Sequence, residues 1–325
     1  MTRQPPKLSV VVPCYNEQEV LPETANRLSK IFDGLIEEGH IHSESRVYFV
    51  DDGSADRTWA IIEDLNRNTT RFEGVKLSRN RGHQNALLAG LLHAPGDAIL
   101  SIDADLQDDL NAINGMLKAH SDGADIVFGV RNDRRSDTYF KRVTAQIYYR
   151  LLKWMDVEAI YNHADYRLMS RRAVEALRQY PESNLFLRAM IPELGFRTAI
   201  VGYERYERFA GASKYPLQKM IALAVQGVTS FSVLPLRIFT LFGFIISIIS
   251  FLLSAWALIA AVVFHSTVPG WASTVVPIYL ICGVQMLCLG VIGEYIGKIY
   301  IETKHRPRFL VDTTTEQKTQ LRDVP

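Results

Sequence analysis

The sequence predicts an α/β domain with a mostly parallel sheet, followed by a helical region that crosses a membrane twice. Two observations lead to this prediction. In the first two-thirds of the chain, short β-branched apolar runs alternate with amphipathic helical patterns, which is typical of βαβ units joined by right-handed crossovers. Further along, Ile238–Phe264 and Trp271–Gly293 contain no charged residue over 27 and 23 residues, whereas about 20 apolar residues suffice to span a bilayer.

The individual elements follow from hydrophobic periodicity, because continuous apolar runs indicate buried strands and apolar residues three or four apart indicate helices. The expected strands are Leu8–Val12, Val47–Val50, Val75–Leu77, Ala98–Ile102, Ile126–Val130, His163–Met169 and Thr198–Tyr203. The expected helices are one ending near Glu38, one carrying Trp59, Ile62 and Leu65, one carrying Leu87, Leu88, Leu91 and Leu92, and those at Tyr139–Val157 and Arg171–Tyr180. Ser54 or Asp56 is expected to cap the second helix, and the polar tail after Val311 is expected to be disordered.

Composition narrows the function classes. The 325 residues suffice for two domains, and 48% hydrophobic with 22% charged residues fits a soluble part joined to an apolar part. A formal net charge of +1 gives no case for nucleic acid as a partner. Cys14, Cys282 and Cys288 are too few and too scattered for a disulfide framework or a zinc site. The N-terminal segment lacks a signal-peptide pattern, so the α/β domain is expected to stay in the cytoplasm.

Charge around the apolar stretches predicts their orientation. The chain divides into an α/β domain at residues 1–215, an interfacial amphipathic helix at 216–234, two transmembrane helices at 235–300 and a tail at 301–325. The connector His265–Gly270 has no Lys or Arg, whereas Arg237 precedes the first span. Four basic residues follow the second span: Lys298, Lys304, Arg306 and Arg308. By the positive-inside rule, both termini should be cytoplasmic and the connector should face outward.

The stretch Asp97–Asp109 is the strongest candidate for a chemical site. If Ala98–Ile102 is a strand, Asp103, Asp105 and Gln107 share one face beyond its C-terminal end. Two carboxylates and an amide oxygen suit Mg²⁺ or Mn²⁺, and ligands of open α/β sheets bind at such strand ends. The stretch is therefore interpreted as a metal site that holds a diphosphate. The alternative is a solvated acidic turn.

Six motifs together resemble the family 2 glycosyltransferases, specifically the membrane-anchored polyprenyl-phosphate glycosyltransferases. The motifs are SVVVPCYNEQEVL, VDDGSADRT, LSRNRGHQNALLAG, SIDADLQDD, DYRLMSRRAV and GASKY, and two apolar spans follow them. The resemblance extends from Leu8 to Val311 and is greatest to the bactoprenol glucosyltransferases; dolichyl-phosphate mannose synthases and aminoarabinose-type transferases are close relatives. It implies a GT-A fold, a nucleotide sugar donor, a divalent metal and a lipid phosphate acceptor.

The resemblance also assigns residues to roles. Donor nucleotide binding is implied for Pro13, Tyr15, Asn16, Glu17, Asp51, Asp52, Arg79, Asn80 and Asp103, and metal binding for Asp103, Asp105 and Gln107. Acceptor phosphate binding is implied for Arg131, Arg142, Arg208 and Ser213, and catalytic roles for Asp105, Asp165, Lys214 and Arg131. The family pattern places a serine four residues after Arg142, whereas this sequence has Gln146.

Several of these residues have a structural alternative. Glu17 could compensate charge at a helix N-terminus, and Asp51-Asp52-Gly53 could serve only as a turn. Lys214 and Arg208 could attract lipid headgroups. Asp165 could be a general base, could orient Arg167 or an acceptor-side arginine, or could cap the helix at Arg171.

The activity that the resemblance implies is inverting transfer of a hexose to polyprenyl (undecaprenyl) phosphate at the bacterial inner membrane. Glucose from UDP-glucose is the first expectation, with mannose from GDP-mannose or an aminoarabinose derivative as alternatives. A homotetramer and a downstream flippase are expected partners by the same resemblance. A processive synthase would need more spans and a Gln-x-x-Arg-Trp string. A non-catalytic membrane scaffold would not need the acidic motif.

Overall fold

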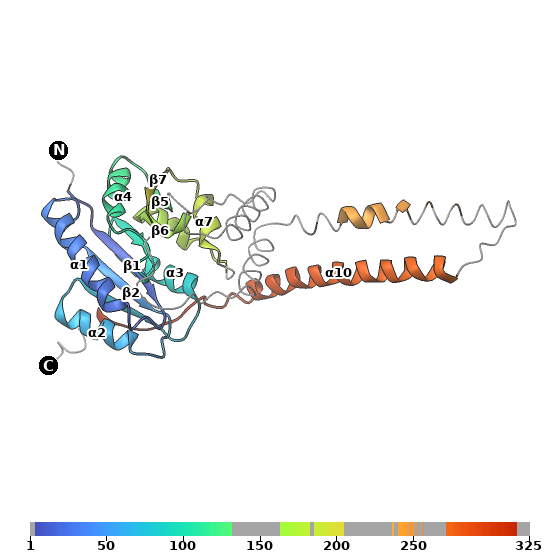
Figure 1. Ribbon diagram of the computed structural model, residues 1–325, viewed down its shortest axis with the longest axis horizontal. Coiled ribbons are helices and arrows are strands. Elements are labelled where there is room, and N and C mark those ends of the chain that lie inside the picture. Colours follow the sequence, from blue (N-terminus) through green and yellow to red (C-terminus); the bar gives the residue numbers. More distant parts are fainter. Residues whose placement is uncertain are drawn as a thin grey trace. The chain divides into compact units, whose positions relative to one another are not determined.

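The computed structural model describes residues 4–131, 163–182, 185–204 and 271–316, together with 236, 240–246, 248–249, 252 and 256. The chain divides into two compact units. The first contains residues 1–153, 158–215 and 305–325, and the second contains 154–157 and 216–304. Figure 1 labels the elements along the chain. The expected helix at Tyr139–Val157 lies outside the described residues.

Within the described part of the first unit, eight strands form one sheet with the order β7-β5-β6-β4-β1-β2-β3-β8. The strands are β1 (Leu8–Cys14), β2 (Arg46–Asp51), β3 (Phe72–Leu77), β4 (Ala98–Ser101), β5 (Ile126–Arg131), β6 (His163–Ser170), β7 (Thr198–Tyr203) and β8 (Val311–Thr314). Strands β4, β1, β2 and β3 run parallel, as do β5 and β7. Strands β6 and β8 are antiparallel to their neighbours. The mixed α/β sheet fits the expected fold.

Helices pack on both faces of this sheet. They are α1 (Leu21–Glu37), α2 (Thr58–Asn68), α3 (His83–His93), α4 (Ala112–Ser121), α6 (Arg171–Arg178) and α7 (Leu187–Glu193). Alternate side chains of β1 point to opposite faces. Val10 and Val12 join a buried cluster with residues of α1, α2 and α4, whereas Val11 lies against Gly90 of α3. Strand β1 is therefore covered on both faces, as its continuous apolar sequence predicts.

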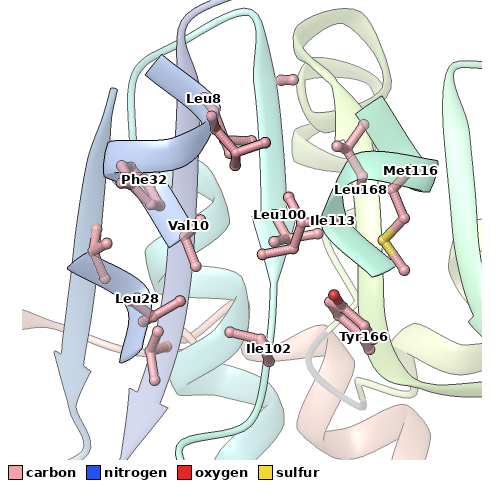
Figure 2. Packing of buried hydrophobic residues seen from close by; sticks show 14 of the residues in the cluster. Leu8, Val10, Leu28, Phe32, Leu100, Ile102, Ile113, Met116, Tyr166 and Leu168 are labelled. Atoms are coloured by element: carbon pink, nitrogen blue, oxygen red, sulfur yellow. The ribbon is translucent and has the colours of Figure 1, made fainter. Parts of the chain in front are cut away.

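The cluster around α1 shows why this segment is helical. The side chains that α1 buries recur every three or four positions: Leu21, Ala25, Leu28, Phe32 and Leu35. Figure 2 shows Leu28 and Phe32 beside Val10 of β1, with Ile113 and Met116 of α4 packing near Leu100 and Leu168. Burying each Leu or Phe side chain stabilises the folded state by roughly 1.5–3 kcal/mol relative to leaving it exposed. This packing keeps the ends of β1 and β4 in place.

Most expected elements are present with bounds shifted by a few residues, and helices α4 and α7 were not expected. Among the predicted termini of these elements, the structure contradicts two. Residues Val311–Thr314 form β8 against β3 and Thr315 is buried, so disorder directly after Val311 is wrong. The N-cap of α2 is Arg57, without a side-chain cap. Asp56, the residue before this N-cap, accepts a hydrogen bond from the Thr58 amide (2.9 Å).

The second unit contains helix α10 (Trp271–Thr303), which continues past the expected end of the second span at Gly293. Among the residues that the structure describes, one segment, Gly283–Thr303, is long and apolar enough to cross a membrane. The first expected span, Ile238–Phe264, lies mostly outside the described residues, and its described positions are helical. The two-span hairpin therefore stays a prediction.

Candidate active site

The candidate site lies at one edge of the sheet. The C-terminal ends of the parallel strands β1, β2, β3, β4 and β5 all reach this edge, and each is followed by polar residues. Strand β6 runs in the opposite direction, so its first residues, including Asp165, arrive at the same edge. Contacts between these segments show that the polar residues gather at this edge.

The loops after β1 and β2 hold each other. The Asn16 amide N–H donates to Ser54 Oγ (2.9 Å), and Asn16 Oδ1 accepts from the Ala55 amide (2.9 Å). The Glu17 amide N–H donates to Thr58 Oγ1 (2.9 Å). Asn16 adopts a positive φ of 54°, which asparagine tolerates better than most residues. Asn16 therefore shapes this loop pair, while the adjacent Tyr15 is 41% exposed at the edge.

Asp51 and Asp52 are both buried but have different surroundings. Asp52 accepts from the backbone amides of Arg81 (2.7 Å) and Gly82 (2.8 Å), so both of its oxygens position the loop after β3. Asp51 Oδ1 accepts from the Ser54 amide (3.1 Å), whereas Asp51 Oδ2 has no hydrogen-bond partner within the described structure. Burial raises the pKa of both carboxyls. Asp51 thus retains an acceptor that a ligand could satisfy.

The loop that carries Arg79 and Asn80 packs directly against the loop after β2. A Cβ at Gly53 would lie 2.6 Å from the Asn80 amide nitrogen, and Gly53 has a positive φ of 66°. Only glycine fits both constraints. Arg79 and Asn80 are exposed, and Asn80 Oδ1 accepts from the Gly82 amide (3.1 Å).

The acidic motif lies in a turn and not on the strand. Strand β4 ends at Ser101, and Leu106 has a positive φ of 59°. The period-two geometry expected for Asp103, Asp105 and Gln107 is therefore wrong, because the strand ends before the motif begins. The turn instead brings the Gln107 amide to Asp105 Oδ1 (3.2 Å).

This turn nevertheless fits a hard divalent cation. Asp103 Oδ1 is buried without a hydrogen-bond partner among the described residues, and burial raises the pKa of its carboxyl. A bound cation would compensate the negative charge of this buried oxygen, which now faces His83 Nε2 at 3.5 Å. All three candidate ligands offer oxygen, which Mg²⁺ and Mn²⁺ prefer. The described residues contain no group of three or more His, Cys, Asp or Glu side chains placed to hold a metal.

A buried charged cluster surrounds Asp165. Its carboxylate accepts from Arg167, which is fully buried, and from Arg188 Nη2 (3.1 Å). His83 Nε2 lies 3.5 Å from Asp165 Oδ2 and 3.5 Å from Asp103 Oδ1. The cluster therefore connects the acidic turn after β4 to the start of β6.

The neighbouring charges determine the protonation states of Asp165 and His83. Burial by itself would raise the pKa of Asp165, but the charge of Arg188, the hydrogen bond from His83 and the charge of Arg167 hold that pKa well below its usual range. Burial lowers the pKa of His83, but its hydrogen bond to Asp165 and the charges of Asp103 and Asp165 outweigh this effect and raise it to about 9. At neutral pH the site therefore contains an Asp165 carboxylate and a His83 imidazolium.

Arg131 lies at the end of β5 and belongs to a second group of contacts. Its Nε donates to Tyr203 Oη (3.1 Å), and its Nη2 lies 3.6 Å from Asp108 Oδ1. Burial and the charge of Asp103 raise the pKa of Asp108 to about 6. Arg131 is thus held at the same edge as the acidic turn.

Comparison with known proteins decides the family. A family model described as Glycosyl transferase family 2 matches residues 9–178. The chain belongs to this family. The uncharacterized glycosyltransferase YkoT of Bacillus subtilis (strain 168) is 48% identical over 314 residues, which cover 96% of this chain and 93% of that protein. The bactoprenol glucosyl transferase of Shigella phage SfV is 40% identical over 309 residues, covering 94% and 98%.

These relatives confirm the resemblance to bactoprenol glucosyltransferases and show that the chain is a glycosyltransferase. Among solved structures, the mannosyltransferase PcManGT from Pyrobaculum calidifontis, in complex with GDP-Man and Mn²⁺, is 18% identical. The similarity covers 90% of this chain and 87% of that chain with a TM-score of 0.45.

In this family 2 glycosyltransferase, several residues that the sequence singled out lie together at one edge of the sheet. The structure brings Asp103, Asp165 and Arg131 to the same sheet edge as the loops after β1, β2 and β3. Four expected site residues lie outside the described residues: Arg142, Arg208, Ser213 and Lys214. Five residues of the charged contacts were not assigned a site role from the sequence: His83, Asp108, Arg167, Arg188 and Tyr203. For His83, Asp108 and Arg167 the available signal was their position within the quoted motifs, and for Tyr203 it was the end of a strand. Arg188 lies in α7 and had no such signal.

Proposed function

We propose that this glycosyltransferase transfers a hexose from a nucleotide sugar to polyprenyl phosphate at a membrane surface. The observation that carries the proposal is the sheet edge itself. The Asp51 oxygen without a hydrogen-bond partner in the described structure, the turn with Asp103, and Arg131 all lie at the C-terminal ends of parallel strands there. The similarity to bactoprenol glucosyl transferases along nearly the whole chain supports a polyprenyl phosphate acceptor. Glucose from UDP-glucose is the first candidate donor.

Donor recognition falls to the loops after β1, β2 and β3. Asp51 Oδ2 is the acceptor that a nucleobase N–H or a ribose hydroxyl would satisfy. Tyr15 and Glu17 lie in the neighbouring loop, directly after Pro13 near the end of β1. Asp52 fixes the loop that presents Arg79 and Asn80. Asp52 then acts on the donor through this loop.

The residues that would hold a divalent metal are Asp103, Asp105 and Gln107. When bound, Mg²⁺ or Mn²⁺ would neutralise negative charge on the leaving diphosphate. Lys214, with Arg208, would add positive charge from a loop that closes over the diphosphate, which is a common use of loop closure.

The acceptor needs positioning more than deprotonation. A phosphate monoester has a second pKa near 6, so it is mostly dianionic at neutral pH. Arg131 and Arg142, with Ser213, would orient it through charge-assisted hydrogen bonds. A phosphate oxygen then forms a bond to the anomeric carbon while the bond from that carbon to the nucleoside diphosphate breaks, and the nucleoside diphosphate leaves with the electron pair. In-line attack would invert the configuration.

Placement in the bacterial inner membrane completes the proposal. Two spans would hold the site at the depth of the lipid phosphate, with the catalytic domain and both termini in the cytoplasm, where nucleotide sugars are made. A homotetramer and delivery of the lipid-linked sugar to a flippase extend the same proposal.

The test is a transfer assay with purified protein, polyprenyl phosphate and radiolabelled nucleotide sugars. We expect UDP-glucose to label the lipid, EDTA to abolish labelling, and Mg²⁺ or Mn²⁺ to restore it. Asp105→Ala should lower the rate at least about a hundredfold, because charge neutralisation by a metal is worth several kcal/mol. Asp109→Ala is the matched control, since this carboxylate caps the Asn111 amide (3.0 Å). Labelling from GDP-mannose or an aminoarabinose donor, and not from UDP-glucose, would change the assigned sugar. Full activity in EDTA would contradict the proposed metal site. If no donor labels the lipid, the proposed transfer is wrong and the non-catalytic scaffold is favoured.

A further inference from the structure

Arg131 is held by two residues that have no assigned role. Arg131 ends β5 and Tyr203 ends the neighbouring parallel strand β7, and the two residues are paired in the strand register. Arg131 Nε donates to Tyr203 Oη (3.1 Å). Tyr203 Oη in turn donates to Asp108 Oδ1 (2.5 Å), in the loop after β4. The contacts form a directed chain from guanidinium to phenol to carboxylate.

The chain is closed by a direct ion pair. Arg131 Nη2 lies 3.6 Å from the same Asp108 oxygen that accepts the tyrosine hydroxyl. The Asp108 side chain is 2% exposed, whereas that of Arg131 is 26% exposed. One edge of the guanidinium is therefore anchored in the protein while part of the group still reaches solvent. A guanidinium has five N–H donors. Among the described residues, the contacts with Tyr203 and Asp108 involve Nε and Nη2, which leaves other donors for a ligand.

Tyr203 is itself fixed by packing. Its ring makes an edge-to-face contact with Tyr166 at a centroid distance of 5.2 Å, and Tyr166 Oη donates to the Asp109 carbonyl (3.1 Å). Tyr166 and Tyr203 are both buried. The Tyr166 hydroxyl, however, donates to a backbone carbonyl and not to Asp108. This difference provides a matched comparison between two neighbouring buried tyrosines.

We propose that Asp108 and Tyr203 are positioning residues that fix the Arg131 guanidinium in the orientation in which it binds the phosphate of the acceptor. The inference rests on the proposed function, because that function assigns the acceptor phosphate to Arg131. An arginine that is preoriented loses less conformational entropy when it binds a phosphate. Removing the phenol hydroxyl should therefore weaken acceptor binding and leave donor binding unchanged.

The first experiment compares Tyr203→Phe with Tyr166→Phe in the full-length protein. We expect Tyr203→Phe to raise KM for polyprenyl phosphate about tenfold, which corresponds to about 1.4 kcal/mol, with KM for the nucleotide sugar unchanged. Tyr166→Phe should leave both values within about twofold. Asp108→Asn, which keeps an acceptor for the hydroxyl but removes the charge, should also raise KM for the acceptor. Equal changes in both KM values, or the same change in both tyrosine variants, would overturn the proposal.

The second experiment does not depend on sugar transfer. Phenylglyoxal modifies accessible arginines, and mass spectrometry of the peptide that contains Arg131 measures its modification rate. We expect a higher rate in Tyr203→Phe than in the wild type and in Tyr166→Phe, and weaker protection of Arg131 by a short-chain polyprenyl phosphate. If the wild type transfers no sugar, the proposed function fails while this measurement still reports on Arg131. Identical Arg131 modification and protection in all three proteins would show that Tyr203 does not position it.

Discussion

At the scale of single residues, the charged cluster decides what Asp165 can do. Its carboxylate meets Arg167, Arg188 and His83, and these cations keep its pKa well below the usual range. A general base works best with a pKa near the working pH, so Asp165 is poorly suited to remove a proton. Its contacts favour the orienting role that the sequence left open. Capping of α6 is excluded, because Ser170 is the N-cap residue of that helix and accepts from the Ala173 amide.

Replacing Asp165 by Asn tests this role. Asp165→Asn should retain partial transfer activity, because the amide oxygen can still accept from Arg188, and raising the pH should not restore the rest. The variant should also be less stable, since breaking a buried ion pair costs roughly 3–5 kcal/mol and Arg167 is fully buried. Rate profiles against pH, compared between the two enzymes at saturating donor and metal, measure the effect. A wild-type profile limited by a group near pH 6 that disappears in the variant would establish a base instead.

His83 predicts a pH dependence of stability with a defined sign. The pKa of His83 is about 9 in the folded protein, above the value of about 6.5 for an unfolded histidine. Its stabilisation is therefore complete below about pH 6.5 and is lost as the pH rises through about 9. In EDTA, the difference in Tm between wild type and His83→Gln should be largest near pH 6 and smallest near pH 10. His40→Gln, at an exposed position, is the control. A difference that grows with pH would contradict the assignment.

At the scale of elements, close packing of α3 on the sheet depends on one glycine. A Cβ at Gly90 would lie 2.3 Å from Val11 Cγ1 of β1 and 2.7 Å from Val50 Cγ2 of β2. Helix α3 could then not approach these strands as closely, and its N-terminus carries His83 into the site. The position of His83 in the site thus depends on Gly90, which lies further along α3 and does not belong to the site.

Gly90→Ala should lower the free energy of unfolding by roughly 1–3 kcal/mol, the usual cost of overpacking. Gly34→Ala in α1 is the matched control, because nothing lies within 4 Å of its added Cβ and alanine is favoured over glycine in helices by up to about 1 kcal/mol. Thermal or denaturant unfolding of both variants measures the difference. Equal stability changes of the same sign would show that the α3 contact is not tight.

Local patterns predicted elements well where burial follows the sequence period. The strands covered on both faces have continuous apolar sequences, and the stripe of α1 has helical spacing. Strand β8 could not be found in this way, because its short polar sequence is stabilised by pairing with β3 and by Thr315. Thr315 Oγ1 donates to Glu73 Oε2 (2.7 Å) and accepts from the Gly74 amide (2.9 Å) across more than 200 residues of sequence.

The same limit applies to the site. The loops that follow parallel strands are ordered by topology, so Asp51, Asp103 and Arg131 could be placed at one edge from the sequence. The contacts of His83 with Asp165, and of Tyr203 with Asp108, join segments about 80 to 95 positions apart. Neither spacing nor periodicity encodes such pairs. Likewise, strand β4 ends at Ser101, and the acidic motif lies in a turn that includes a left-handed residue, Leu106. Residue periodicity does not predict such a turn.

At the scale of the whole molecule, α10 has a surface that needs an apolar surrounding. Several large apolar side chains of this helix are more than half exposed: Ile278, Met286, Leu289, Ile296, Ile299 and Ile301. Transfer of such side chains from water to hydrocarbon is favourable by roughly 25 cal/mol per Å². The exposure supports the proposed membrane location. It does not fix the direction of insertion, for which charge asymmetry is the available argument.

The orientation can be tested by cysteine labelling. In a variant without the three native cysteines, a cysteine at Ser266 marks the connector between the spans, which lacks Lys and Arg. A cysteine at Asp312, exposed on β8 of the first unit, marks the opposite side. Because basic residues favour the cytoplasmic side, a membrane-impermeant maleimide should label the Ser266→Cys protein in intact spheroplasts and the Asp312→Cys protein only after lysis. Transfer activity of each variant controls for folding. If only the Asp312→Cys protein is labelled from outside, the orientation is the reverse of the proposed one and the site is separated from cytoplasmic nucleotide sugars. If both proteins are labelled from outside, the chain does not have the two proposed spans.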